Sequence, residues 1–483
     1  MKRLRWMVLC GAAAAAFLLA ARAAPAADAP GATALDYLKI ARDFADCMIK
    51  YGRDRYGKVQ SPLIANSLTR EREPTITPYP LFAEPTRTAD YMTTPFRMFN
   101  FNACTNYPPG LGAEGPHKVT VYGCDPYEDR ELYEMLFDLT RITGIPVYRA
   151  EAEKALQWWF RNTQGPAGLY PWGEHLGWDF QYDCPTYFDG PSQYLYAACY
   201  HEIKDNVPFL DILARIPAAR AGDPTPLERY ALGIWNAHFW DKDRAYYCRH
   251  GDYTGKDDRN GSDAGFPAHL GAYMRVWAAA YLASERPDFK KQMEGVFGNV
   301  LDMAISRSEK YGFFPLTFAP ELAGKDPGKQ APEESVRLSR HAAEVADQLA
   351  QAAPQIEARL RRLSEVCGGP QKPSAPPIAA PVPAVRAANL PKQRFSGQYA
   401  DEIIRWVKAY RQYRNVAYLE AAQTMARGAY GDFCDDTCPL PKALARGTPL
   451  ATAAGDPFPD FYFRGAKLMH AFALLGEAML KKG

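Results

Sequence analysis

Three residues from separate segments of the chain have side chains that could bind a transition metal together: His175, Glu202 and His250. Imidazole nitrogen suits borderline ions such as manganese, cobalt, nickel or zinc, whereas an all-oxygen set would indicate calcium or magnesium. The three residues are 27 and 48 positions apart, which is not a compact zinc-binding motif. Spacing alone therefore leaves open whether they form a metal site or are unrelated polar groups.

The stretch from Gly168 to Tyr253 holds the highest density of residues that could contact a ligand. Its first part is rich in glycine, which indicates a loop, and loops often carry binding residues. The side chains that we expect to contact substrate are charged or aromatic: Trp172, Glu174, Trp178, Asp179, Lys204 and Tyr253. The tryptophans offer ring faces on which sugars could stack. We expect Tyr200–Lys204 to lie at the end of an aromatic-rich helix that begins near Ser192.

An arginine, Arg249, directly precedes His250. This order of His, Glu and Arg-His resembles the pectate lyases of polysaccharide lyase family two and their (α/α) toroid relatives, over about Leu35 to Tyr253. The resemblance implies that a divalent transition metal (Mn, Co, Ni or Zn) is held by His175, Glu202 and His250. It also implies that Arg249 is the catalytic base. The intervals between the ligands are slightly longer than those of the family.

Such a lyase removes the proton beside a uronate carboxylate and expels the glycosidic oxygen. A metal ion bound to that carboxylate offsets its charge and makes the proton more acidic. A guanidinium is normally protonated, which is a physical objection to Arg249 as the base. The alternative is that Arg249 grips a second carboxylate, with the base being Lys204, Tyr247 or Tyr253.

Three stretches of the chain share one plan. In each, a helix ends, a short turn carries Pro or Asn, an aromatic residue follows, and a second amphipathic helix begins. The second helices are expected at Arg149–Asn162, Lys290–Ser306 and Leu419–Arg427. Strand signals are sparse, with Val119–Tyr122 the best candidate. We predict an all-α fold, an (α/α) toroid or barrel of about six or seven helical hairpins with few short strands; an open array of hairpins is the alternative.

Composition divides the chain into four predicted parts. They are a signal peptide (residues 1–26), a first toroid part with the active-site loops (27–322), a helical and Pro-rich insertion (323–392) and the closing toroid helices (393–483). Within the insertion, a charged, Ala-rich helical stretch is interrupted at Pro354, and the Pro-rich run after Gly368 is typical of an extended linker.

The N-terminus has the pattern of an export signal. A basic start is followed by a short apolar run, Trp6–Ala21, and by small residues around Ala24, as in signal peptides. We therefore predict a periplasmic or secreted protein, with no membrane segment after signal removal. Export permits disulfides, and Cys434 with Cys438 is one pairing that the sequence allows.

The charge balance excludes one class of partner. Lys and Arg number 57 against 55 for Asp and Glu, so the chain lacks the basic footprint of a nucleic-acid binder. Aromatic residues make up 13% of the chain, and they suit either a large core or sugar stacking. We expect His201 and His238 to be structural, and His269, His341 and His470 to lie on helices without partners.

The leading hypothesis is a metal-dependent polysaccharide lyase that cleaves uronate-containing, pectate-like chains by β-elimination. Its expected partner is an acidic polysaccharide or oligosaccharide. One rival keeps the toroid but hydrolyses glycosides with a carboxylate pair, drawn from Glu174, Asp179, Asp183 and Asp189. A second rival is a non-catalytic periplasmic glycan-binding protein, in which aromatic residues bind sugar and the His, Glu and Arg residues are structural.

Overall fold

The computed structural model describes most of the chain from Asp36 onward. The described residues are 36–77, 123–127, 129–170, 176–181, 183–187, 200–203, 207–252, 265–316, 331–368, 396–443, 461–463 and 465–482. All elements below belong to one unit, Tyr37–Gly483. The predicted signal peptide and the predicted strand Val119–Tyr122 lie outside the described residues.

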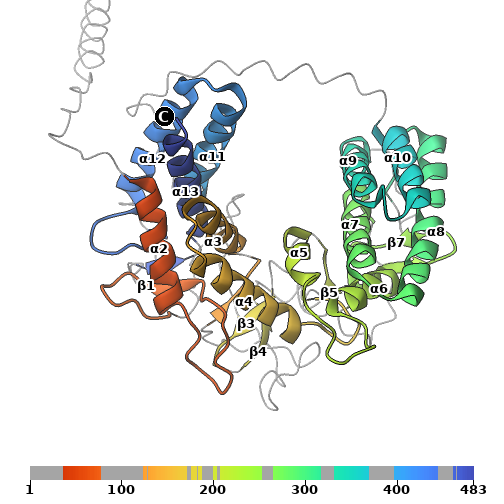
Figure 1. Cartoon of the computed structure of the whole chain (residues 1–483), viewed down its shortest axis with the longest axis horizontal. Helices are drawn as coiled ribbons and strands as arrows, with labels where there is room; N and C mark the ends of the chain where they lie inside the picture. The colour runs from red at the N-terminus through yellow and green to blue at the C-terminus, as the bar shows by residue number, and fades with distance from the viewer. Residues whose placement is uncertain are drawn as a thin grey trace, which may run out of the picture. The chain divides into compact units, whose positions relative to one another are not determined.

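One group of helices is centred on α13 (Ala466–Leu480), which packs against α2 (Tyr37–Tyr51), α3 (Arg130–Thr143), α11 (Ser396–Tyr413) and α12 (Val416–Phe433) (Figure 1). Eleven of the fifteen residues of α13 are buried. A helix surrounded by other helices must be apolar on most of its surface, and α13 meets this requirement with Ala, Leu, Met and Phe.

A second group is built around α7 (Pro267–Ala283), which packs against α6 (Pro226–His238), α8 (Pro287–Tyr311) and α9 (Ala331–Leu349). The helix α10 (Pro354–Gly368) packs against α8 and α9. Pro354 stands at the first residue of α10, because proline ends the preceding helix but suits the first turn of a new one. The two helices of the predicted insertion thus lie against α7 and α8.

The three predicted hairpins are present. The first is α3 with α4 (Val147–Asn162), where Gly144 adopts the left-handed conformation (φ 73°) that ends a helix. In the second, α7 ends at Ala283 and Pro287 begins α8. The third joins α11 to α12, where the side chain of Asn415 accepts a hydrogen bond from the Ala417 N–H (3.0 Å) and caps the helix.

The described strands are short and form four small antiparallel sheets. They pair β1 (Ser67–Thr69) with β9 (Phe461–Phe463), β3 (Leu176–Asp179) with β2 (Gly123–Cys124) and β4 (Cys184–Tyr187), β5 (Tyr200–His201) with β8 (Gly251–Asp252), and β6 (Phe239–Asp241) with β7 (Tyr246–Tyr247). The prediction of a mainly helical fold, built from helical hairpins with few short strands, is confirmed. The prediction that Tyr200 and His201 end a helix is wrong, because they pair with β8 as a strand.

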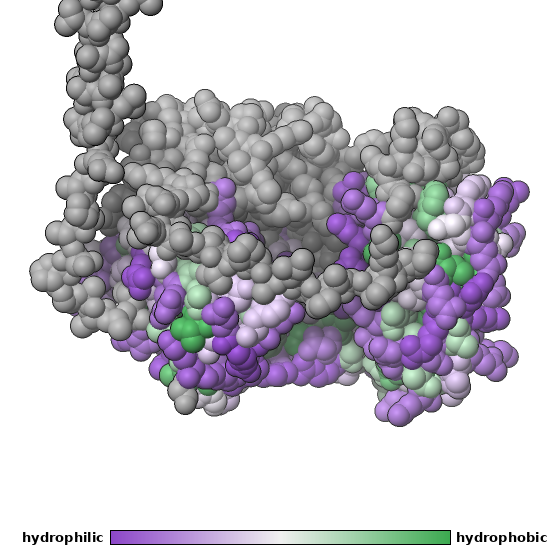
Figure 2. Space-filling view, turned by 90° about the horizontal axis from the view of Figure 1, so that it is seen from above, coloured by the Kyte–Doolittle hydropathy of each residue, from purple (hydrophilic) through white to green (hydrophobic). Residues whose placement is uncertain are grey.

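The structure shows the character of the described surface and the state of two cysteines. On the face seen in Figure 2, hydrophilic residues predominate over the described helices and hydrophobic residues form scattered patches. In the described part of the chain, no helix combines the length and apolar character needed to cross a bilayer. Cys434 and Cys438, which the sequence allowed to pair, are both thiols in the structure.

Candidate functional site

The pairing of β5 with β8 brings Glu202 beside Arg249 and His250. Tyr200 pairs with Asp252 and His201 with Gly251. In an antiparallel pair, the position after His201 therefore lies opposite the position before Gly251. Glu202 and His250 occupy these positions, so that two predicted ligands 48 residues apart in sequence are brought together by one short ladder.

The carboxylate of Glu202 is almost completely buried, with a side chain 2% exposed. Its Oε2 accepts a hydrogen bond from Arg249 Nη2 at 2.8 Å, and His250 Nε2 lies 3.9 Å from the same oxygen. A buried carboxylate needs such a partner because burial in a low dielectric disfavours its charge. The Arg249 side chain is 34% exposed and so connects the buried carboxylate to the surface.

His269 contacts the other carboxylate oxygen of Glu202. Its Nε2 lies 3.0 Å from Glu202 Oε1. Pro267 begins α7, which places His269 in the first turn of that helix. The prediction that His269, His341 and His470 have no partners is wrong: His470 lies 2.8 Å from Asp138 and His341 3.7 Å from Glu344. His269 and Glu202 are 67 positions apart and meet only through the packing of the chain. The sequence offered one signal for the place of His269. Pro267 marks the start of a helix, and His269 therefore lies in its first turn.

Buried aromatic and imidazole groups form a hydrogen-bonded network beside the β5–β8 strand pair. His201 Nδ1 lies 2.8 Å from His238 Nε2, and His201 Nε2 lies 2.8 Å from the hydroxyl of Tyr230. His238 Nδ1 in turn lies 2.8 Å from the hydroxyl of Tyr273, which donates to the carbonyl of Cys248 at 3.0 Å. Cys248 directly precedes Arg249, so this network helps to fix the backbone that carries the candidate catalytic residue.

Burial keeps the two histidines of this network neutral. It lowers the pKa of His238 to about 3 and lowers that of His201 well below its usual value, because a charged imidazole loses its hydration in the interior. Both side chains are buried, which confirms their predicted structural role. Gly251 is required beside them: a Cβ at this position would lie 2.4 Å from His238 Nε2.

Half of the predicted site residues fall outside the part of the chain that the structure describes. They are Trp172, Glu174, His175, Lys204 and Tyr253. The structure therefore brings Glu202, Arg249 and His250 together, and the place of His175 beside them stays a prediction.

Two further predicted contacts lie in the interior. Trp178 is buried (6% exposed) and packs edge-on against Trp158, with ring centroids 4.9 Å apart. Asp179 is completely buried, and its Oδ1 accepts a hydrogen bond from the Gln181 N–H at 2.8 Å. These positions do not favour the predicted substrate contacts, which remain predictions.

Tyr247, one of the alternative bases, is not placed for that role. Its side chain is completely buried and its hydroxyl donates to the carbonyl of Phe266 at 2.9 Å. Burial raises the pKa of Tyr247 well above its usual value. Its burial and its hydrogen bond to a backbone carbonyl do not favour Tyr247 as the base.

The carboxylates considered for a hydrolase shape turns where they are described. Asp183 accepts hydrogen bonds from the backbone N–H groups of Lys58 (2.6 Å) and Val59 (3.1 Å), and Asp179 holds the β3–β4 turn as described above. The other two, Glu174 and Asp189, lie outside the described residues.

The donor chemistry of the Glu202 site fits a borderline divalent metal. Glu202 supplies a carboxylate and His250 an imidazole, and such mixed donors suit manganese, cobalt, nickel or zinc. Among the described residues, no three His, Cys, Asp or Glu side chains already form a metal-binding group. A metal ion would be held by Glu202 and His250, with His175 as the third predicted ligand.

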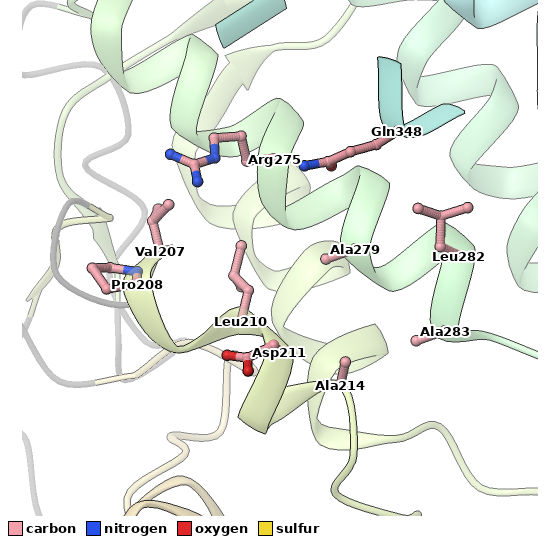
Figure 3. A pocket seen from close by; sticks show the side chains of 10 residues that line it. All are labelled: Val207, Pro208, Leu210, Asp211, Ala214, Arg275, Ala279, Leu282, Ala283 and Gln348. Carbon is pink, nitrogen blue, oxygen red and sulfur yellow. The ribbon is translucent and has the colours of Figure 1, made fainter. Parts of the chain in front are cut away.

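Another hollow in the described part of the chain lies elsewhere on α7. Its volume is about 530 Å³, and Figure 3 shows it between α7 and the segment formed by the 3₁₀ helix η5 (Val207–Phe209) and α5 (Leu210–Leu213). Asp211, Arg275 and Gln348 supply polar groups to walls that are otherwise mostly Ala, Leu and Val. Glu202, Arg249 and His250 do not line this hollow.

Comparison with known families agrees with the resemblance seen in the sequence. The model of a family described as periplasmic pectate lyase matches residues 128–269, a range that contains Glu202, Arg249, His250 and His269. The resemblance to pectate lyases is thus confirmed over this part of the chain, and it supports a glycan-processing enzyme.

Solved structures with similar folds are distant. The cellobiose 2-epimerase from Spirochaeta thermophila DSM 6192 is 13% identical, with 92% of this chain and 96% of that chain covered and a TM-score of 0.37. The cellobiose 2-epimerase from Bacillus thermoamylovorans B4167 is 9% identical, with 76% and 90% covered and a TM-score of 0.35. An unsaturated glucuronyl hydrolase specific for heparin is 12% identical, with 93% and 98% covered and a TM-score of 0.32. These similarities carry no argument about the reaction.

Proposed function

We propose that the protein is a metal-dependent polysaccharide lyase that cleaves uronate-containing, pectate-like glycans by β-elimination. The observation that carries the proposal is the buried carboxylate of Glu202, held between Arg249, His250 and His269, inside the region matched by the pectate lyase family. The family is described as periplasmic, and the export signal in the sequence agrees with work in the periplasm or outside the cell.

A bound manganese, cobalt, nickel or zinc ion would offset the charge of the substrate carboxylate. Glu202 and His250, with His175 as predicted, are the residues that would hold it. Glu202 suits this role because its carboxylate is buried and its orientation is fixed by donors on both oxygens.

Arg249 is the candidate catalytic residue. In the elimination, a base takes the proton from the carbon beside the uronate carboxylate. The electron pair of the broken C–H bond forms a carbon–carbon double bond. The glycosidic oxygen leaves with its own bonding pair and is protonated. The ion pair with Glu202 stabilises the protonated guanidinium. Proton abstraction by Arg249 therefore requires that Glu202 be engaged elsewhere, and the partial exposure of Arg249 allows it to turn toward substrate.

The proposal is tested by following the ultraviolet absorbance of unsaturated uronate products from polygalacturonate, with and without a chelator. A rise in absorbance that the chelator abolishes and added metal restores is the expected result. Reducing ends without that absorbance would indicate hydrolysis and overturn the lyase assignment. Binding of polygalacturonate with neither product would indicate a glycan-binding protein.

A further inference from the structure

We propose that His269 is a positioning residue that fixes the orientation of the Glu202 carboxylate. This inference rests on the proposed function only where activity is measured. Its basis is the contact between the side chains of His269 and Glu202. His269 Nε2 lies 3.0 Å from Glu202 Oε1. An ionised carboxylate only accepts hydrogen bonds, so Nε2 carries the proton and donates it.

The position of His269 is determined by the helix that carries it. His269 lies in the first turn of α7, two residues after Pro267, and its backbone N–H donates to the Phe266 carbonyl at 3.0 Å. Its ring packs beside that of Phe266, with centroids 5.6 Å apart. The side chain is 15% exposed, which leaves it little freedom to turn away from Glu202.

The two oxygens of Glu202 are held by different elements. Arg249, in the segment before β8, donates to Oε2 at 2.8 Å, and His269, on α7, donates to Oε1. The terminal torsion of a glutamate side chain is soft, with broad rotamer wells. Two donors from separate elements therefore set the plane of the carboxylate, and the loss of either would leave the group free to rotate about that torsion.

The arrangement matches a general feature of metal and catalytic sites. Residues that orient a ligand by hydrogen bonding affect metal affinity or activity by about 10- to 100-fold when they are removed. His269 would act in this way on Glu202, from outside the set of three predicted ligands.

The experiment compares His269→Ala with His269→Gln in the full chain. The amide nitrogen of glutamine can occupy the place of Nε2 and donate to Glu202, whereas alanine cannot. We expect His269→Ala to weaken cobalt(II) binding, followed by its visible absorbance, by about 10- to 100-fold, and His269→Gln to restore most of it. His470→Ala on α13, whose imidazole contacts the carboxylate of Asp138 at 2.8 Å, is the matched control and should bind as the native protein does. Equal loss in both His269 variants would overturn the positioning role.

A second measurement does not depend on metal or activity. In the chelator-treated full chain labelled with ¹⁵N-histidine, His269, identified from the spectrum of His269→Gln, should show the tautomer with the proton on Nε2. Its signal should move in Glu202→Ala. The opposite tautomer, or a signal unaffected by Glu202→Ala, would overturn the inference. If the tautomer is as expected but no unsaturated product forms, the proposed function fails while the positioning contact stands.

Discussion

Two buried carboxylates of this protein are surrounded in different ways. Glu477 on α13 accepts hydrogen bonds from Arg141 on α3 (2.6 and 3.0 Å), from Arg411 on α11 (2.6 Å) and from Lys481 (2.6 Å). Hydrogen bonding from Arg141 is the largest of the effects that lower the pKa of Glu477, to about 2. All these partners are cations near neutral pH, and in that state none of them offers a lone pair to a metal.

Glu202 has one arginine and two imidazoles around it instead. An imidazole can donate a hydrogen bond in one state and present a lone pair to a metal in another. The Glu477 cluster therefore joins three helices and has no further chemistry, whereas the Glu202 cluster can rearrange. The comparison teaches that the kind of partner, and not burial alone, distinguishes a candidate site from a structural ion pair.

The largest expected effect is on activity. Glu202→Gln removes the charge that would hold the metal, and we expect lyase activity to fall by about 10³-fold, with loss of bound metal by elemental analysis. Glu477→Gln is the matched change in the other cluster and should retain activity per folded molecule. Similar losses in both variants would mean that the two carboxylates do not differ in role.

Arginine-to-lysine changes should separate the clusters next. Lysine keeps the charge but not the planar fork of donors. We expect Arg249→Lys to lower kcat by about 10²-fold. Arg411→Lys should change kcat less than about threefold, because Glu477 keeps Arg141 and Lys481 and lies outside the proposed site. Steady-state kinetics on polygalacturonate measure both, and an active Arg249→Lys would exclude a specific role for the guanidinium.

The Glu477 cluster should matter for stability although it does not matter for activity. Glu477→Gln leaves two arginines and a lysine around a neutral group, and we expect the free energy of unfolding to fall by about 2 kcal/mol. Urea unfolding followed by circular dichroism measures the change. Lys481→Ala, which removes a side chain that is 66% exposed, should cost less than about 0.5 kcal/mol. A larger loss for Lys481→Ala than for Glu477→Gln would contradict this view of the cluster.

The smallest expected effect is on the pH dependence of stability. Burial lowers the pKa of His238 from 6.5 to about 3, so below pH 6.5 the unfolded state binds a proton that the folded state does not. The stability contributed by neutral His238 is complete above pH 6.5 and decreases as pH falls toward 3, by about 1.4 kcal/mol between pH 7.5 and 5.5. Glu477, with its pKa lowered from 4.5 to about 2, loses its contribution only below pH 4.5.

Urea titrations at pH 7.5 and 5.5 check this separation. His238→Gln should remove about 1.4 kcal/mol of the pH dependence, whereas Glu477→Gln should leave the difference between these two pH values unchanged. An unchanged pH dependence in His238→Gln would show that His238 already accepts a proton in the folded protein.

Local signals explain why much of the fold could be predicted. Gly144, Pro287 and Asn415 end or begin helices by backbone conformation, ring geometry and side-chain capping, and each acts within a few residues of its own position. Amphipathic spacing then defined the helices on either side. The prediction that Tyr200 and His201 end a helix was wrong because a two-residue strand has no periodicity of its own. Such a strand exists only through pairing with its partner strand.

Some features of the candidate site could likewise be predicted from the sequence, and others could not. The sequence by itself determined the Arg249-His250 pair and the choice of Glu202, because residue type and order were enough to express the resemblance to pectate lyases. It also determined three of the helical hairpins of the fold. Only the tertiary structure decided that His269 joins Glu202, that Trp178 lies in the interior, and that Glu477 is a structural carboxylate. Each of these depends on contacts between segments far apart in the chain, and such contacts are set by packing and strand register, which no local pattern encodes.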